Sequence, residues 1–363
     1  MSELKYLVAL HSLPGMGTKR LKILVDYFQN YEYAWQGDKH WLRIPGFQGS
    51  GGELAFEARQ HSDMEIIYEK FLQSEARIVT LEEDAYPPLL KNIYDPPYLL
   101  YYKGNLPEED DLCIGMVGAR RATPYGRHIA ETIAQELAEK GVWVVSGLAR
   151  GIDTWSHRGC LKGGSKTIAV LGSGIDVIYP PENKALFQEI SSMGGVLSEF
   201  PLGTPPLPQH FPARNRIISG LCRGVVVVEA AEKSGSLITA DCALEHGRDV
   251  FAVPGPVTSI MSRGTHRLVK QGAKLVENAF DILEEYLDTE KEALQVDLFT
   301  FSQKERGILE LMMGGGAHFD ILVEKSGVLA GEMASLLTLW EIKGLVKQLP
   351  GKYYILNQKF LTG

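Results

Sequence analysis

Short apolar segments alternate with amphipathic ones between about residues 75 and 287, and this pattern constrains the fold more than any other feature. The run Val225–Val228 consists of four valines, which is typical of a strand buried on both faces. Strands followed by helices in this rhythm predict a doubly wound, parallel α/β sheet. We predict strands at 114–117, 143–146, 167–171, 195–199, 225–229 and 250–253, and helices at 126–139, 153–162, 182–193, 212–222 and 236–246.

The flanks follow other patterns. Residues 1–74 predict a helical domain, in which Leu13–Leu21 has the form of a helix-hairpin-helix turn. Such a turn either packs between domains or contacts a DNA backbone through its amides, and the sequence leaves both open. Residues 75–287 form the sheet domain, 288–302 a charged linker, and 303–363 a helix-turn-helix followed by a hairpin, which predicts a winged helix.

The second helix of this winged helix carries Glu332 and Glu341 and no arginine. A helix that reads base edges in the major groove normally offers Arg, Asn or Gln. The C-terminal domain is therefore expected to contact protein, or DNA weakly, rather than to read sequence.

Charge and cysteine content narrow the class of protein. The formal net charge is −8, which argues against indiscriminate coating of nucleic acid. Residues 112–255, however, hold 14 Lys and Arg against 13 Asp and Glu, so a local basic cleft can exist there. The four cysteines are widely spaced, which predicts neither a zinc site nor disulfides. No apolar run reaches membrane-spanning length, and we expect a cytoplasmic protein without metal or other cofactor.

Glycines and cations follow the predicted strands, where parallel sheets bind their ligands. Glycines let a backbone approach closely, and helix starts offer free N–H groups to anions. The run 211–218 adds two arginines and an asparagine after a proline that we place at a helix entrance. Arginines in such a place either bind phosphate or pair internally, here with Glu199 or Asp153. Several such loops at one edge predict a polyanion-binding cleft.

Familiar nucleotide and catalytic signatures are incomplete. A serine interrupts the phosphate-loop pattern at 159–167, and the dinucleotide fingerprint at 172–177 lacks its third glycine. Asp153, His157 and Cys160 could form a catalytic group, but we favour a capping aspartate that holds a histidine beside a buried cysteine. Glu229 could act as an acid or base, although acceptance of hydrogen bonds from loop amides is the favoured reading.

Together these segments resemble the DNA-processing protein A family (DprA, also called Smf). The resemblance rests on 118–120, 146–153, 172–180, 211–220, 229–230, 234–240 and 247–255, which follow one another through the central domain. The flanking domains match more loosely. One departure is His266, at a place where the family often has asparagine.

The resemblance implies an extended Rossmann-like fold that binds single-stranded DNA, without enzymatic activity. It further implies a dimer formed through this domain, and help in loading the RecA recombinase during natural transformation. Carried over residue by residue, the DNA contacts would be Gly118, Arg120, Ser146, Gly147, Gly172, Gly174, Lys184, Arg214, Asn215, Arg216 and Ser236.

Two other functions remain open. The same sheet resembles phosphoribohydrolases that cleave nucleoside monophosphates, although their P-G-G-x-G-T-x-x-E run is replaced here by residues 233–239. A scaffold that recruits RecA through its C-terminal domain is the second.

Overall fold

The computed structural model describes residues 3–37, 39–286, 302–312, 316–342, 345–349 and 351–356. The chain divides into two compact units, Met1–Leu283 and Glu284–Gly363. Buried apolar side chains form separate clusters in the two units. Among the described residues, every helix is too short or too polar to cross a bilayer.

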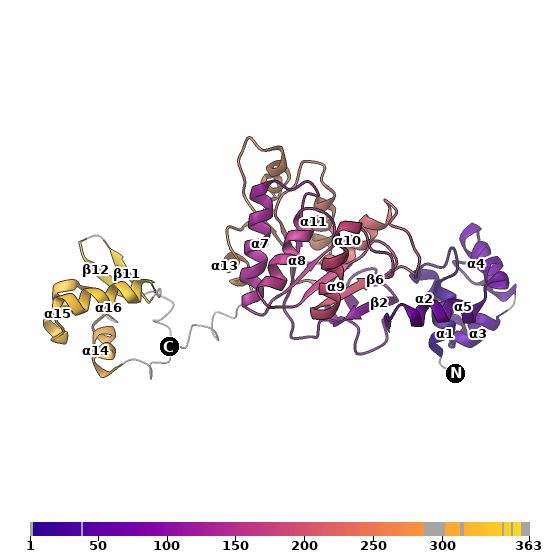
Figure 1. The fold of residues 1–363 in the computed structure, drawn as a ribbon, viewed down its shortest axis with the longest axis horizontal. Coiled ribbons are helices and arrows are strands. Elements are labelled where there is room, and N and C mark those ends of the chain that lie inside the picture. The colour runs from indigo at the N-terminus through magenta and orange to yellow at the C-terminus, as the bar shows by residue number, and fades with distance from the viewer. Residues whose placement is uncertain are drawn as a thin grey trace. The chain divides into compact units, whose positions relative to one another are not determined.

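The described residues of the first unit form a nine-stranded sheet (Figure 1) in the order β1-β2-β6-β5-β4-β3-β7-β8-β9. From β6 to β9 all neighbouring strands are parallel. The strand order reverses direction at β3, so the switch point lies between β3 and β7. The bounds are β1 Arg77–Thr80, β2 Leu99–Gly104, β3 Cys113–Val117, β4 Trp143–Ser146, β5 Thr167–Val170, β6 Gly195–Ser198, β7 Gly224–Val227, β8 Asp249–Ala252 and β9 Lys274–Leu275.

All six predicted strands are confirmed, each within one or two residues of its expected ends. The expectation of a wholly parallel sheet was incomplete, because β1 and β2 extend it antiparallel beyond β6. In β2, Tyr101 lies opposite Ser198 of β6, which is far along the chain. The sheet is therefore mixed but mostly parallel.

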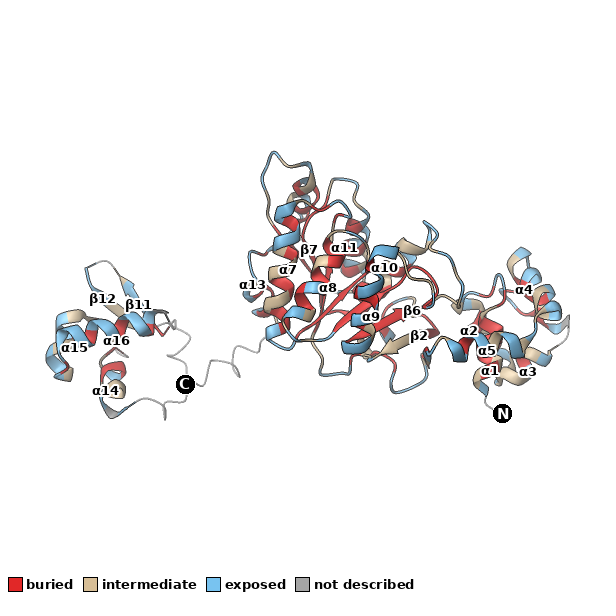
Figure 2. Ribbon diagram, in the orientation of Figure 1, coloured by how far each residue is buried: buried red, intermediate tan, exposed pale blue. Residues whose placement is uncertain are grey.

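Helices connect the parallel strands, and their exposed faces lie away from the buried strands (Figure 2). Helix α7 shows why such a helix begins where it does: Pro124 supplies the fixed φ of its first position, and the Thr123 hydroxyl accepts a hydrogen bond from the Gly126 amide at 3.1 Å. The bounds are α6 Pro88–Lys91, α7 Pro124–Glu139, α8 Ile152–Lys162, α9 Lys184–Met193, α10 His210–Leu221, α11 Gly235–Glu245, α12 Arg263–Lys270 and α13 Phe280–Leu283, with 3₁₀ turns at Pro181–Asn183 and Ile260–Ser262.

Helix α10 begins two residues before its predicted start. His210 opens the helix, so Pro212 lies within the first turn rather than at the entrance. A proline in the first turn removes only an amide that would have had no partner inside the helix. The consequence is that Arg214 and Arg216 lie beyond the first turn.

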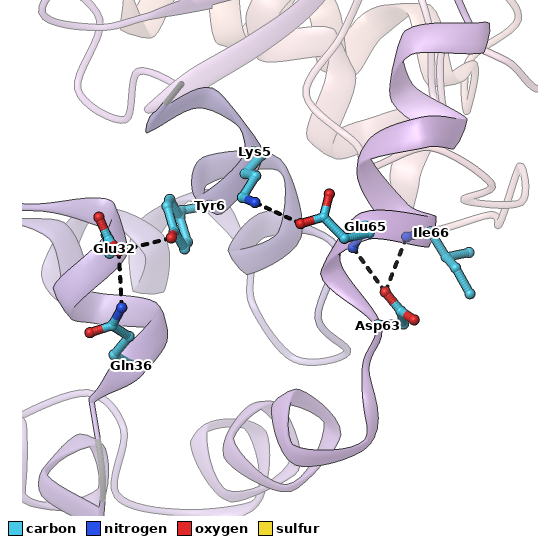
Figure 3. A network of polar contacts seen from close by, with 7 residues as sticks. All are labelled: Lys5, Tyr6, Glu32, Gln36, Asp63, Glu65 and Ile66. Atoms are coloured by element: carbon cyan, nitrogen blue, oxygen red, sulfur yellow. Dashed lines mark hydrogen bonds and ion pairs between the residues drawn. The ribbon is translucent and has the colours of Figure 1, made fainter. Parts of the chain in front are cut away.

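Five α-helices precede the sheet within the described residues: α1 Glu3–His11, α2 Thr18–Phe28, α3 Tyr31–Gln36, α4 Ser50–His61 and α5 Met64–Gln73, with a 3₁₀ turn at Lys39–Arg43. Polar contacts join α1 to its neighbours (Figure 3). The Tyr6 hydroxyl donates to Glu32 of α3 at 2.9 Å, and the Lys5 ammonium donates to Glu65 of α5 at 2.6 Å.

These helices and the sheet share one hydrophobic cluster. It includes Leu10 and Trp41 from the helices and Leu99, Tyr101 and Val196 from β2 and β6. The N-terminal helices therefore pack on the β2–β6 side of the sheet as part of the same compact unit.

The described residues of the second unit form three helices and a three-stranded sheet of order β10-β12-β11. Helix, turn, helix and hairpin follow one another as predicted, and the helix before them and β10 complete the unit. The predicted linker, 288–302, lies outside the described residues except for Ser302. The bounds are α14 Gln303–Met312, β10 Ala317–His318, α15 Phe319–Ser326, α16 Ala330–Ile342, β11 Val346–Leu349 and β12 Tyr353–Leu356.

Candidate functional site

A pocket of about 560 Å³ opens at the carboxyl ends of the parallel strands, beside the switch point between β3 and β7. Loops that follow β3, β4, β5, β6 and β7 line it, together with residues of α10 and the start of α11. The described lining is Val117, Gly118, Arg120, Ala149, Asp153, Tyr179, Pro206, Pro208, Phe211, Pro212, Arg214, Asn215, Ile218, Ser234, Gly235, Ser236, Ile238 and Thr239. This is the edge at which the sequence predicted a cleft.

One side of the pocket combines a cation with aromatic rings. The exposed Arg120 guanidinium lies over the ring of Phe211, 4.9 Å from its centroid. The ring of Tyr179 lies 5.9 Å from that of Phe211, and Arg150 lies over Tyr179 while pairing with Glu182. Rings can stack on bases, and a free guanidinium can bind phosphate oxygens. The arrangement therefore suits a ligand that has both.

Arg214 forms the floor of the pocket. Its side chain is buried, its Nη1 donates to the Val170 carbonyl, and its Nε has no partner among the described residues. Burial lowers the pKa of Arg214 to about 10, although the nearby Asp153 opposes that shift. Asp153 accepts hydrogen bonds from the amides of Gly147 and Ala149 at 3.2 and 3.3 Å. Asp153 thus fixes the loop after β4, while Arg214 is bonded to the end of β5.

Gly147 makes room for Arg214. A Cβ atom at residue 147 would lie 2.1 Å from Nη1 of Arg214, which no packing could tolerate without movement. Glycine at this position is therefore required by the packing of the buried Arg214, whether or not a ligand also approaches it.

The eleven predicted site residues divide by position. Five line the large pocket, and Arg120 also lines a smaller adjoining one with Gly147 and Gly172. The five are Gly118, Arg120, Arg214, Asn215 and Ser236.

Four predicted residues line neither pocket. Ser146 is fully buried and donates to the Met116 carbonyl at 2.6 Å, while the Gly174 amide donates to the Thr204 carbonyl at 2.9 Å. Lys184 is the exposed first residue of α9. Arg216 pairs with Glu199 and donates to the Asp95 carbonyl. Pairing with Glu199 is the internal arrangement that the sequence left open.

The candidate catalytic groups are occupied by structural contacts. Glu229 accepts hydrogen bonds from the amide and hydroxyl of Thr123, at 2.9 and 2.5 Å, as the favoured reading expected. The expectation that Asp153 caps its helix and holds His157 was wrong. Asp153 accepts hydrogen bonds from the loop amides of Gly147 and Ala149 rather than capping α8, and His157 Nδ1 contacts the Thr167 hydroxyl at 2.7 Å. Burial lowers the pKa of His157 to about 3 and raises that of Cys160 to about 12. Neither group is disposed to act as a base or nucleophile near neutral pH.

Nothing in the described part of the chain gathers three or more His, Cys, Asp or Glu side chains as a metal site. His266, at the position where the sequence departs from the resembled family, contacts the Gly255 carbonyl at 3.0 Å.

Sequence reasoning did not name Tyr179, Phe211 and Arg150 as site residues. Their signal was present: each lies in a segment that follows a strand or opens a helix at the predicted edge. From the sequence alone, aromatic residues in such segments could equally well pack in the hydrophobic core. Only the pockets they line identify Tyr179, Phe211 and Arg150 as site residues.

Comparison with protein families gives two matches. Residues 77–287 match the family described as DNA recombination-mediator protein A, and residues 292–352 match the DprA winged helix domain. Among curated proteins, Protein Smf of a Synechocystis strain is 34% identical over 97% of this chain and 98% of its own. DNA processing protein DprA of Streptococcus pneumoniae is 50% identical over 56% of this chain and 72% of its own.

Two solved structures are similar as well. DNA processing protein A from Streptococcus pneumoniae superposes with a TM-score of 0.68 at 38% identity, covering 78% of this chain and 98% of that one. The protein from Helicobacter pylori, solved in a study of its single-stranded DNA binding mode, gives a TM-score of 0.53 at 33% identity. It covers 58% of this chain and 96% of that one.

Proposed function

Because this chain belongs to the DNA recombination-mediator protein A family, whose members include DprA and Smf, we propose that it binds single-stranded DNA in the pocket at the switch point. The observation that carries the proposal is the Arg120–Phe211 pair, with Tyr179 beside it. Single-strand binding without sequence preference needs cations for the backbone and rings for the bases, and the pocket offers both.

The predicted contacts take different roles in this proposal. Arg120, Asn215 and Ser236 line the pocket and reach the strand, while Gly118 and Gly172 allow its backbone to approach. The buried Arg214 fixes the floor and contributes positive charge. For four residues, DNA contact stays a prediction: Ser146, Gly174, Lys184 and Arg216. Because Ser146 is buried, it would act through the shape of its loop.

The wider role extends this binding. By holding and protecting incoming single strands, the protein would help to load RecA during natural transformation, acting as a dimer formed through the sheet domain. We propose no catalytic step. The occupied carboxylate of Glu229 supports binding over phosphoribohydrolase chemistry.

Replacing Arg120 by Ala, or Phe211 by Ala, should weaken binding of a fluorescent oligonucleotide by roughly fivefold or more, as loss of a stacking or phosphate contact implies. Arg120→Ala should also flatten the dependence of log affinity on log salt by about 0.7 for one phosphate on a single strand. Fluorescence anisotropy across a salt series measures both.

Arg121→Ala is the matched control, because Arg121 is the exposed neighbour of Arg120 and does not line the pocket. It should bind as the wild type does. Equal affinity of the wild type for single-stranded and duplex DNA would contradict the proposal. Release of base from nucleoside monophosphates would favour the hydrolase instead.

A further inference from the structure

Helix α10 lines three separate hollows of the first unit. Phe211, Arg214 and Asn215 line the large pocket, His210 lines a second hollow, and Arg216 lines a third. The second and third lie on the N-terminal hairpin, residues 12–20, which both of them include in part. One helix therefore connects the pocket to the hairpin.

The third hollow, of about 390 Å³, is basic. Its lining is Gly17, Thr18, Lys19, Arg20, Gly46, Asp95 and Arg216. Because Arg216 pairs with Glu199, the three cations of the lining meet two carboxylates, Asp95 and Glu199. Lys19 pairs with Asp95 at 2.9 Å, yet 71% of its side chain remains exposed. Arg20 donates to the carbonyls of Gly15 and Gly46 and is half-buried. The hollow thus keeps a net positive charge that solvent can reach.

An exposed aromatic residue precedes a lining residue of this hollow in the chain. Tyr94 precedes the lining residue Asp95 and is fully exposed, which is unusual for a large apolar ring. Exposed rings next to cations are the combination that single strands use for stacking.

The second hollow, of about 510 Å³, lies between the hairpin and the loop after β6. Within it the rings of Phe200 and His210 stack, with centroids 4.3 Å apart. Residues of this same loop continue into the large pocket, where Pro206 and Pro208 form part of its lining. The second hollow therefore connects the other two: it shares Gly17 and Arg20 with the basic hollow, and its His210 is the neighbour of Phe211 in the large pocket.

We propose that the basic hollow at the N-terminal hairpin is a second contact site for the same DNA strand. A strand held in the large pocket continues across the Phe200–His210 pair, places a phosphate against Lys19 and Arg20, and stacks a base on Tyr94. This inference rests on the proposed function of the large pocket and adds a site to it. It assigns the hairpin to DNA contact rather than to packing alone.

Space at the hairpin fits this role. A Cβ at Gly17 would meet nothing within 4 Å, so the fold of the described residues leaves its surface open. Gly15, by contrast, has a positive φ of 80°, and a Cβ there would lie 2.4 Å from the carbonyl oxygen of Gly51, so the turn requires glycine at this position. Gly17 thus leaves room for a ligand, whereas Gly15 is required by the turn.

The test measures affinity against oligonucleotide length, from about 4 to about 24 nucleotides, for the wild type and for the double variant Lys19→Ala/Tyr94→Ala. Short strands fill the large pocket alone, so the two proteins should bind them equally. Beyond the length that reaches the hairpin, the wild type should gain affinity and the variant should lag by about fivefold or more, as one lost base stack implies.

Lys70→Ala/Tyr33→Ala is the matched control, because it removes an exposed lysine and an exposed tyrosine from the same helical part away from the hollow. It should follow the wild type at every length. Both removed side chains of the test variant are exposed, and circular dichroism checks that both variants keep the wild-type fold.

Three outcomes are decisive. Separation of the curves only at longer lengths supports the second site. Coincidence at all lengths, or an equal loss at all lengths, overturns it. Failure of the proposed function would look different, because Arg120→Ala would then leave binding unchanged at every length.

Discussion

At the scale of single residues, two buried histidines make stability depend on pH. His11 and His157 are almost fully enclosed, and burial lowers the pKa of each to about 3. In the unfolded chain a histidine titrates near 6.5. Between these values the unfolded state binds protons that the folded state does not, so acidification below about pH 6.5 favours unfolding.

We expect His157→Gln to reduce this acid sensitivity. Each buried histidine adds a slope of about 1.4 kcal/mol per pH unit between pH 6.5 and the folded pKa. The variant should lose the slope of one histidine, read from urea midpoints between pH 5 and 8. His128→Gln, at an exposed position of α7, should keep the wild-type slope. An unchanged slope in His157→Gln would refute the assignment.

The sequence could not distinguish the arginines of the site. Arg120 follows a strand, Arg214 and Arg216 lie where the sequence predicted a helix start, and the sequence predicted contacts for all three. The structure exposes the first, buries the second and pairs the third with Glu199. Which arginine faces solvent depends on the elements packed around it, and those meet only in the folded chain.

At the scale of elements, Thr123 links two of them. Its hydroxyl caps α7, and its amide and hydroxyl donate to the buried Glu229, which follows β7. Thr123→Ala should lower the free energy of unfolding by about 2 kcal/mol, since it removes a helix cap and a hydrogen bond to a buried carboxylate. Thr123→Ser keeps the hydroxyl and should retain most of that stability. Equal urea midpoints for the two variants would contradict this account.

Prediction of the elements succeeded where the pattern was local. A parallel strand such as β7 is predicted by its apolar run between two turns. The strands β1, β2 and β9 were not predicted, because β1 and β2 are antiparallel and lie outside the strand-helix alternation, and β9 has only two residues. The start of α10 was misplaced because Pro212 marks a first turn as readily as a first residue.

At the scale of the whole molecule, the N-terminal helices and the sheet should unfold together, because they share one hydrophobic cluster. Leu10→Ala removes a fully buried side chain of α1 and should cost about 2–5 kcal/mol. Hydrogen exchange should report this loss in α1 and equally in β2 and β6. Loss confined to the helices would show that they fold on their own.

Leu337→Ala is the counterpart in the second unit, where Leu337 is equally buried in a separate cluster. It should raise amide hydrogen exchange in α14 to β12 and leave the nine-stranded sheet of the first unit protected. Together the two variants test whether each hydrophobic cluster stabilises only its own unit.

Separate clusters also bear on how such a chain can change over time. The residues that line the large pocket lie between Val117 and Thr239, entirely within the first unit. The second unit can therefore be shortened, lost or exchanged for another module without disturbing a single wall of that pocket. The pocket and the second unit are in this sense parts that can vary independently of one another.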